Sequence, residues 1–588
     1  NTASYLPVCI VNCRRHVHGR NYDTGRNTNM SPICQCDAET NSEMKTKFCL
    51  VNYQVFITLV IVLCIVYEVR TFNVEDRKPI YFQEKENAMF GYTVAFIENS
   101  TGITSILIGA PNQTGVDGIK GYGGFYECEI NSLRQGRGSC KKHDIVDKIC
   151  QKLRTQYKCE DYQMLGATIA VNHKYQDVKH NMNIPRVSVC APGWKYILTE
   201  KYGNKLNFPV GKCYHFKETW QYESCDEYEY CIPFWKKLNE IEISMGGFSM
   251  KYSQDGKYSL IGGPGANQER GAVKSHQIKN EHIFDKRKDG LWVQYFGFSL
   301  TTANFNEHGS FTAGIPNYHP NQQGYTGRVE VFSVVDFARK NALNFGETTS
   351  CDGDITVIIN EHPQSGTKFG YVVEGINVDG KGMDELFVGA PLYSEFVMKR
   401  VVSPDTGRVF VYRVTTEKIC GPIVVLTGAA SDPSLRKLAA YARFGTAISS
   451  AGDLNHDGYK DVAIGAPYED EYTGAVYIYN GGTDGVKNVF SQRIAGRVMA
   501  SNTPGSNIQT FGWHINGEYD VDKNGFTDLA IGAYKNDVAI VLRTRPVVNV
   551  TMDIRLFPSI IPLNGTPGSA CGDAPCLRLM VCFSYIVE

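Results

Sequence analysis

The sequence has almost no net charge, little tryptophan and few of the motifs on which enzymes depend. Its 60 lysines and arginines against 61 aspartates and glutamates give a formal charge of −1. This balance argues against a nucleic-acid-binding protein, because such proteins carry a basic surface. HExxH, GxSxG and Walker patterns are missing and the 13 histidines are scattered, so no catalytic constellation is indicated. By contrast, 57 glycines, 34 tyrosines and 29 phenylalanines favour a folded chain rich in strands and turns.

Long apolar runs are also scarce, and only residues 48–67 form one. Its strongest part covers residues 55–67, and Lys45 and Lys47 precede it. This pattern is typical of a secretory signal and is short for a membrane span. We therefore expect residues 1–71 to form a leader that contains the signal segment, with the mature chain starting near Phe72. A signal anchor is the alternative.

Cysteine pairs with the CxxC spacing of metal sites are absent, although the chain has 19 cysteines. Closely spaced cysteines in a strand-rich chain predict local disulfides formed in an oxidising compartment. The candidate pairs are Cys128–Cys140, Cys150–Cys159 or another local pairing, Cys190–Cys213, Cys225–Cys231, Cys351–Cys420 and Cys571–Cys576. N-glycosylation sequons, which indicate the same compartment, occur at Asn99, Asn112, Asn549 and Asn564. The spacing alone leaves the disulfide connectivity open.

A short pattern recurs seven times along the chain. An aromatic residue, Leu or Met followed by Gly opens each copy, and an apolar run ending in Gly-Ala-Pro or a variant of it follows. The copies begin at Phe90, Leu165, Met245, Phe296, Phe369, Phe444 and Phe511. Apolar residues at period two, as in 474–479, indicate further strands within the copies. Seven four-stranded units predict an all-β fold, a seven-bladed β-propeller over residues 72–545. A solenoid is the competing architecture.

Two of these units contain an acidic loop with the pattern D-x-[DN]-x-[DN]-G-x-x-D. Calcium prefers six to eight hard oxygen ligands, and the glycine at position six allows the sharp turn. The predicted ligands are the side chains of Asp453, Asn455, Asp457 and Asp461 with the carbonyl of Tyr459, and those of Asp520, Asp522, Asn524 and Asp528 with the carbonyl of Phe526. We expect two Ca²⁺ ions with a structural role. A plain Asp/Asn/Gly turn is the alternative.

A third loop, residues 377–385, matches the pattern less well. Its candidate ligands are Asn377, Asp379, Glu385 and the carbonyl of Met383. Lys381 occupies a position where an oxygen ligand should lie, and an ammonium group cannot bind a cation. An ordinary turn in which this lysine replaces the cation is therefore favoured over a third calcium site.

The Phe-Gly … Gly-Ala-Pro repeats, with acidic loops confined to the last few, resemble the FG-GAP repeats in the head of an integrin alpha subunit. Residues 72–82 resemble the mature start of that family. Residues 545–554 resemble the entry into its thigh domain, an immunoglobulin-like β-sandwich, so 546–588 would be a truncated thigh domain. The spacing between the second and third repeats leaves no room for an inserted domain. The resemblance thus implies an invertebrate-like head fragment that lacks this domain.

The resemblance implies a cell-surface adhesion receptor subunit that signals across the membrane and forms an obligate heterodimer with an integrin beta subunit. Both subunits would bind an extracellular-matrix or cell-surface ligand through the upper face of the propeller. Candidate contact residues are Trp194, Tyr196, Trp220, Tyr222 and Tyr228. Loop packing around disulfides is the alternative role for these aromatics. His276 stands where family members that bind Arg-Gly-Asp place an acid, which slightly favours a laminin-like ligand.

Two other functions compete with the receptor hypothesis. The chain could be a secreted FG-GAP propeller protein that has no partner subunit. It could also be a propeller-bearing enzyme such as a phospholipase. An enzyme would need a metal cluster or a nucleophile with its base, and the sequence offers neither. We therefore expect a protein that is not an enzyme.

Overall fold

The computed structural model describes the larger part of the chain. The described residues are 8–14, 74–84, 87–99, 102–115, 120–130, 136–143, 162–174, 176–177, 182–183, 185–199, 205–217, 220, 243–277, 280–285, 293–305, 309–319, 324–333, 339–344, 364–398, 400–415, 418–502, 508–557 and 577–587. The chain divides into two units, Phe72–Arg545 and a second unit formed by Asn1–Thr71 with Pro546–Glu588.

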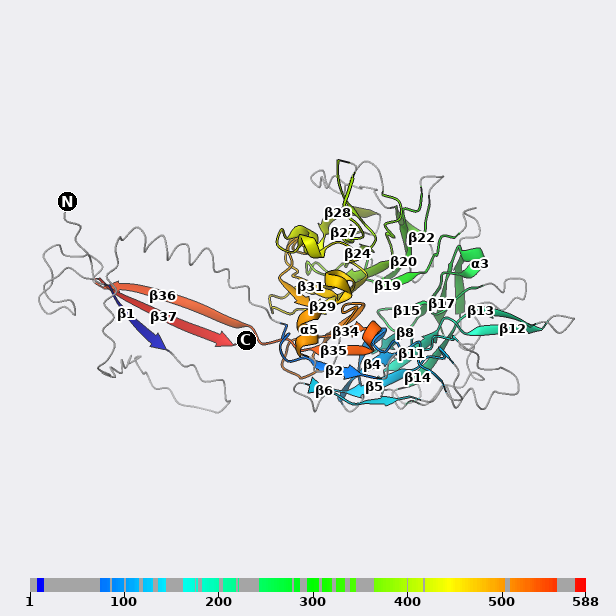
Figure 1. The fold of residues 1–588 in the computed structure, drawn as a ribbon, viewed down its shortest axis with the longest axis horizontal. Coiled ribbons are helices and arrows are strands. Elements are labelled where there is room, and N and C mark those ends of the chain that lie inside the picture. The colour runs from blue at the N-terminus through cyan, green and yellow to red at the C-terminus, as the bar shows by residue number, and fades with distance from the viewer. Residues whose placement is uncertain are drawn as a thin grey trace, which may run out of the picture. The chain divides into compact units, whose positions relative to one another are not determined.

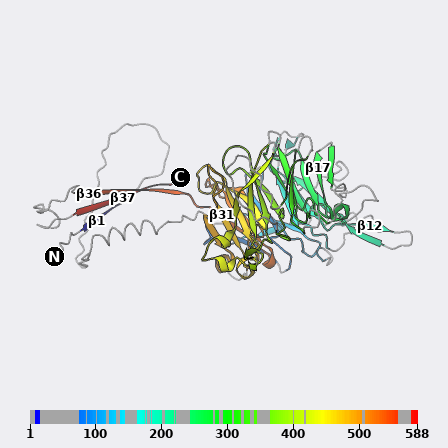
Figure 2. The same ribbon diagram turned by 90° about the horizontal axis from the view of Figure 1, so that it is seen from above.

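The first unit is a seven-bladed β-propeller whose blades follow one another around a ring (Figures 1 and 2). The inner strands are β3 (Thr93–Glu98), β8 (Thr168–Asn172), β15 (Ser249–Tyr252), β19 (Ser299–Ala303), β23 (Val372–Ile376), β29 (Ala447–Gly452) and β33 (His514–Tyr519). The second strands are β4 (Thr104–Gly109), β11 (Arg186–Ala191), β16 (Ser259–Gly263), β20 (Ser310–Ile315), β24 (Glu385–Ala390), β30 (Asp461–Ala466) and β34 (Asp528–Ala533). Each inner strand pairs antiparallel with the second strand of its own blade.

Third and outer strands complete the blades. The third strands are β5 (Phe125–Glu129), β14 (Lys212–Lys217), β17 (Ala272–Gln277), β21 (Arg328–Ser333), β27 (Arg408–Val414), β31 (Ala475–Tyr479) and β35 (Val538–Leu542). The outer strands are β7 (Cys140–Lys142), β18 (Asn280–Asp285), β22 (Arg339–Asn344), β28 (Ile419–Leu426), β32 (Gln492–Ala495) and β2 (Ile80–Gln83). Blade two has three strands among the described residues. Most second and third strands are buried along their whole length, which explains their nearly continuous apolar runs.

The last blade is completed by a strand from the start of the unit. Strand β2 pairs antiparallel with β35, with Ile80 opposite Val541, and β6 (Gly136–Arg137) runs parallel beside β2. Nearby, Glu75 N donates a hydrogen bond to Arg543 O over 2.8 Å. Both ends of the propeller segment therefore meet in blade seven and close the ring.

The repeated glycines lie where neighbouring blades touch. A Cβ atom on Gly465 of the Gly-Ala-Pro segment would lie 2.0 Å from the carbonyl oxygen of Gly512 in the next blade. The same close approach pairs Gly109 with Gly166, Gly262 with Gly297, Gly314 with Gly370, Gly389 with Gly445 and Gly532 with Gly91. The residue that precedes the glycine of the next blade, Phe or Leu, is buried, as Phe444, Phe511 and Leu165 show. The Phe-Gly and Gly-Ala-Pro motifs are thus the two halves of one contact between blades, which has glycine on both sides at six interfaces.

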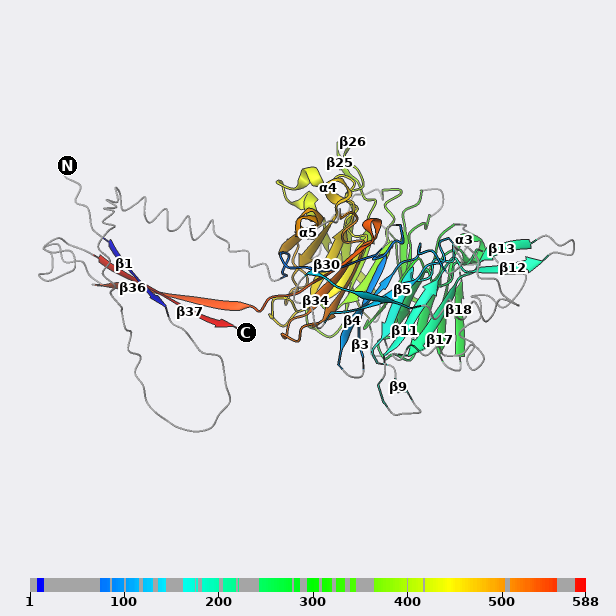
Figure 3. The same ribbon diagram turned by 60° about the horizontal axis from the view of Figure 1, so that its bottom comes forward.

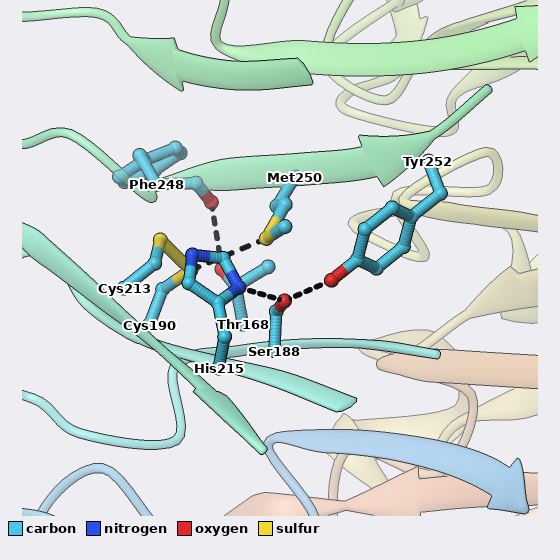
Figure 4. Close-up of a disulfide and its surroundings, with 8 residues drawn as sticks. All are labelled: Thr168, Ser188, Cys190, Cys213, His215, Phe248, Met250 and Tyr252. Atoms are coloured by element: carbon cyan, nitrogen blue, oxygen red, sulfur yellow. Dashed lines mark hydrogen bonds between the residues drawn. A yellow bond between two sulfur atoms is a disulfide. The ribbon is translucent and has the colours of Figure 1, made fainter. Parts of the chain in front are cut away.

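Blade two carries Cys190 where the other blades have the glycine of Gly-Ala-Pro, and this cysteine is bonded to Cys213 on the adjacent strand (Figure 4). Gly247 of blade three lies against it, since a Cβ there would be 2.7 Å from the Cys190 Cβ. Beside the disulfide, Ser188 Oγ lies 2.6 Å from His215 Nδ1 and also bonds the Tyr252 hydroxyl of blade three. The disulfide therefore lies within blade two at its interface with blade three, and the hydrogen bond from Ser188 to Tyr252 joins the two blades.

A second disulfide links Cys128 and Cys140 across strands β5 and β7. Cys420 is also disulfide-bonded, and its predicted mate Cys351 lies outside the described residues. The other candidate pairs, Cys150–Cys159, Cys225–Cys231 and Cys571–Cys576, also fall outside them.

The hydrophobic core is divided among the interfaces between adjacent blades. One cluster, for example, joins Val476 and Ile494 of blade six to Ile531 and Ile540 of blade seven. Each blade therefore shares its apolar side chains with both neighbours, and the ring is stabilised by contacts between blades.

Connections leave the ring on two opposite faces (Figure 3). Those from the second to the third strand hold α3 (Ala266–Glu269), α4 (Glu469–Tyr472), η7 (Tyr534–Asn536) and the hairpins β12 (Lys195–Thr199) with β13 (Lys205–Pro209) and β25 (Glu395–Val397) with β26 (Arg400–Ser403). Those from the inner to the second strand lie on the other face, with β9 (Gln176–Asp177) and β10 (Met182–Asn183) in blade two. Between blades lie η5 (Gly428–Ser431), η6 (Arg436–Leu438) and α5 (Gly496–Asn502). We call the first face the upper face and the second the lower face.

The second unit contains one three-stranded sheet. Strand β36 (Val548–Phe557) pairs antiparallel with β37 (Leu577–Val587), and β1 (Val8–Arg14) runs parallel to β37. Strand β1 lies within residues 1–71, which the sequence pattern predicts to be a leader, and it is not predicted by that pattern. The hydrophobic segment 48–67 lies outside the described residues. The β-sandwich remains a prediction.

Candidate metal centres and partner face

The loop of blade seven gathers three carboxylates on the lower face. It connects β33 to β34, and carboxylate oxygens of Asp520, Asp522 and Asp528 lie within 4.8 Å of one another. Asp520 is held by hydrogen bonds from Asn524 N (3.1 Å) and Gly525 N (2.7 Å), while Asp528 is fully buried at the start of β34. Three converging carboxylates with an all-oxygen donor set fit a hard divalent cation such as Ca²⁺.

The loop of blade six has the same internal hydrogen bonds. Asp453 accepts bonds from Asp457 N (3.1 Å) and Gly458 N (2.8 Å), and the buried Asp461 accepts from Leu454 N (2.9 Å) and Gly481 N (3.1 Å). Among the described residues, only the blade-seven loop has three carboxylates within that distance. Position three of the blade-six loop is Asn455, whose amide donates to Asp457 over 2.9 Å.

Both loops carry more negative than positive charge, with three aspartates against one lysine in each. Burial, together with the nearby carboxylates of Asp457 and Asp453, raises the pKa of Asp461 to about 7. The pKa of Asp528 is raised to about 7 for the same reasons. In blade seven, Arg543 supplies part of the missing charge, with its Nη1 lying 3.4 Å from Asp522 Oδ2. A bound cation would provide the remainder.

The blade-five loop already contains a cation of its own. The ammonium of Lys381 lies 3.0 Å from Asp379 Oδ2 and donates to the carbonyl of Thr483 over 2.7 Å. Glu385 accepts a bond from Val378 N, and burial raises the pKa of Glu385 to about 7. Two other candidate ligands of this loop, Asn377 and Met383, are partly buried and exposed, respectively. These contacts are those expected where a lysine stands in for the metal.

A cavity of about 640 Å³ runs between the inner strands of all seven blades. Tyr92, Phe248, Phe298, Tyr371 and Trp513 line its upper end. The rings of Tyr468 and Tyr534 lie beside Trp513, at 6.5 Å and 4.7 Å between centroids. We call these seven residues the aromatic rim. Ring centroids lie 4.7 Å apart for Trp513 and Tyr534, 5.5 Å for Tyr92 and Trp513, and 5.0 Å for Phe298 and Tyr371. All seven side chains remain partly exposed. The upper face thus presents a ring of aromatic surfaces around an opening.

The rim is not among the residues predicted from the sequence, although the sequence contains a signal for it. Tyr92, Phe298, Tyr371 and Trp513 directly follow the glycine that opens their repeats. An aromatic residue at that place directly precedes an inner strand and lines the cavity.

The predicted ligand-contact residues are only partly described. Trp220 is packed in the molecule, with its indole N–H donating to Glu127 Oε2 (2.9 Å) and its ring 4.0 Å from the ring of His143. These contacts favour the packing alternative for Trp220. Trp194 is partly buried on the upper face, with the Lys212 ammonium 5.3 Å from its ring centre. Tyr196 and His276 lie in β12 and β17 with side chains outside the description, and Tyr222 and Tyr228 lie outside the described residues.

Two of the four predicted glycosylation sites have described side chains. Asn99 accepts a bond from Ile103 N (2.9 Å), and Asn112 donates to Asn87 O (2.6 Å); both lie at the surface. Asn549 lies in β36, and Asn564 lies outside the described residues. Their glycosylation stays a prediction.

Replacing His514 should make the propeller less sensitive to acid. Burial in the cavity wall, and then the nearby Lys251 ammonium, lower the pKa of His514 to about 4. An unfolded histidine titrates near ~6.5, so protonation of the unfolded state costs stability as the pH falls from about 6.5 to about 4. His514→Gln should remove this contribution, roughly 3 kcal/mol at its largest. Urea unfolding of both proteins at pH 7, 5.5 and 4.5 measures the free energy of unfolding. If both proteins lost the same stability as the pH falls, the prediction would be wrong.

None of the described helices is both apolar and long enough to cross a bilayer.

In comparisons with known proteins, the FG-GAP repeat family matches residues 444–479. Integrin alpha pat-2 of Caenorhabditis elegans is 27% identical over 552 residues, which cover 88% of this chain and 40% of the relative. Integrin alpha-5 of Xenopus laevis is 28% identical over 548 residues, 88% of this chain and 47% of the relative.

Integrin alpha-8 of Gallus gallus is 28% identical over 534 residues, 87% of this chain and 47% of the relative. The chain spans less than half the length of these curated relatives. They are integrin alpha subunits, and no enzyme family is indicated. Together with seven blades joined by Phe-Gly and Gly-Ala-Pro contacts, these matches identify the chain as a homologue of the integrin alpha subunits that contains their FG-GAP β-propeller.

Proposed function

We propose that this chain is the head of a cell-adhesion receptor subunit that pairs with an integrin beta subunit at the cell surface. The observation that carries the proposal is the aromatic rim on the upper face of an integrin-alpha-like propeller. Aromatic faces attract cationic side chains, most strongly when several surround one point. The rim therefore suits a lysine or arginine that a partner inserts into the opening.

The upper face already uses this interaction within the chain. The guanidinium of Arg443 lies 4.6 Å from the ring centre of Tyr468, and that of Arg408 lies 3.9 Å from the ring centre of Tyr393. Burial raises the pKa of Tyr371, and the neighbouring Tyr92 and Tyr468 raise it further. A partner cation there would meet both ring faces and hydroxyl oxygens.

The remaining parts of the proposal follow from the homology and the loops. Two Ca²⁺ ions would be held by the loops of blades six and seven in a structural role. The paired head would bind an extracellular-matrix ligand jointly, with a laminin-like ligand slightly favoured over Arg-Gly-Asp. In the whole receptor this binding would be signalled across the membrane.

The enzyme alternative finds no support among the described side chains. The Ser188–His215 pair has hydrogen-bond geometry, but the two residues are 0% and 4% exposed, so substrate cannot reach them. A secreted propeller without a partner remains the competing function, and partner capture separates the two.

Capture of soluble integrin beta-subunit heads by the full chain tests the proposal. Tyr92→Leu with Trp513→Leu keeps apolar volume but removes two rings of the rim, and should weaken capture more than tenfold, as expected of aromatic hot spots. Tyr441→Leu, which changes an exposed tyrosine outside the rim, should leave capture unchanged. Failure of the unmodified chain to capture any beta head would refute the receptor function. Full capture by the rim variant would refute the role of the rim.

A further inference from the structure

Neighbouring acidic loops on the lower face contact one another in a repeating way. We number the residues of each loop from the first aspartate or asparagine of the pattern, which is position one. The aromatic ring at position seven of one loop then lies against the residue at position four of the preceding loop. Position seven contributes its carbonyl to the expected cation site, and position four lies between the ligands at positions three and five. Each contact therefore connects the ligand set of one loop to that of the next.

The contact between the loops of blades seven and six is an aromatic pair. Phe526, at position seven of the blade-seven loop, is 1% exposed, and its ring centre lies 4.6 Å from that of His456. His456 is at position four of the blade-six loop and has a left-handed backbone, with φ of 58°. Beside this pair, Thr527 Oγ1 donates to the carbonyl of Ala451 over 2.6 Å.

The contact between the loops of blades six and five follows the same plan. Tyr459, at position seven of the blade-six loop, lies against Gly380, where a Cβ would be 3.2 Å from its ring. The blade-five loop is fixed by its own lysine. Lys381 forms an ion pair with Asp379 of the same loop and donates a hydrogen bond to the carbonyl of Thr483 in blade six. The series therefore starts at a loop that needs no metal.

The series ends at blade one. Lys523, at position four of the blade-seven loop, donates to the carbonyl of Gly102 over 3.1 Å and lies 3.9 Å from Glu98. Lys523 therefore contacts a turn of blade one that lacks the acidic pattern. Lys523 has the same position in its loop as His456 has in the blade-six loop, and its backbone is similar, with φ of 57°. Its described contacts are to blade one and not to another acidic loop.

We propose that His456 and Phe526 are positioning residues that couple cation binding in the loops of blades six and seven. A cation in the blade-seven loop fixes the Phe526 carbonyl and hence its ring. The fixed ring then holds His456, and with it the turn that presents Asn455 and Asp457. The blade-six loop has less conformational freedom left to lose, so its cation binds more tightly. This inference rests on the proposed calcium binding.

Calcium titration calorimetry on the full chain, stripped with chelator, tests the coupling. Asp522→Asn weakens the blade-seven site, and we expect the affinity of the blade-six site to fall about fivefold with it. In a His456→Asn background, which keeps a residue tolerant of the left-handed backbone but removes the ring, Asp522→Asn should no longer affect the blade-six site. His456→Phe restores a ring and should restore the coupling. Lys523→Asn, the matched position-four control, should preserve it.

The outcomes separate this inference from the function on which it rests. An unchanged blade-six affinity after Asp522→Asn would overturn the coupling while leaving two independent calcium sites. Equal losses with and without the His456 ring would show that the effect travels by another route, and would also overturn it. If the unmodified chain bound no calcium at all, the proposed metal sites themselves would fail.

Discussion

Gly532→Val should leave the propeller unable to close, with a loss of stability on the order of 3 kcal/mol or more. A Cβ on Gly532 would lie 2.0 Å from the carbonyl oxygen of Gly91, which is backbone and cannot move aside by changing a rotamer. This contact joins blade seven to blade one, so the larger side chain separates the blades where the ring closes. Urea unfolding of the purified chain, together with its soluble yield, measures the effect.

Gly482→Ala is the matched control. The nearest atom to a Cβ on Gly482 would be 3.8 Å away, so this change should leave the unfolding midpoint in place. If Gly532→Val unfolded at the midpoint of the unmodified protein, the glycine contact would not be needed for closure.

Asp457→Ala with Asp522→Ala should remove most of the stabilisation by calcium. A ligand present at 100 times its Kd stabilises the folded state by ~2.7 kcal/mol per site, so two sites supply roughly 5 kcal/mol. The double variant should therefore melt well below the unmodified chain in calcium, and both proteins should melt together in chelator. Thermal unfolding under the two conditions measures the difference.

Asp484→Ala changes an exposed acid outside the pattern and should behave as the unmodified protein in both buffers. An equal loss in calcium and in chelator would assign the effect to hydrogen bonds such as that from Tyr459 N to Asp457 (3.1 Å), and the metal would no longer be needed to explain it.

The fold could be predicted because the repeat records a contact that recurs at every blade. Gly465 meets Gly512 as Gly389 meets Gly445, so the same residue types return at each interface and can be counted along the chain. The acidic loops could be found for a similar reason, since many of their hydrogen bonds, such as those from Leu454 N to Asp461 and from Val521 N to Asp528, join residues seven positions apart.

Contacts between distant segments could not be predicted in this way. Nothing near Trp220 in the sequence indicates that its indole bonds Glu127 of blade one. The aromatic rim depends on seven blades bringing their inner strands to one opening, which only the closed ring does. The pairing of Phe526 with His456 likewise requires two loops to be neighbours in space.

Closure of the ring by β2 has a consequence for the order of synthesis. Ile80 is made long before its partner Val541, so β2 leaves the ribosome without the strand that it pairs with. Until β35 is complete, β2 and the inner edge of blade one expose unpaired backbone groups and apolar side chains that attract other chains. The nascent chain therefore depends on protection of its first blade until the seventh is made, and stalling before Leu542 would release an open, aggregation-prone ring.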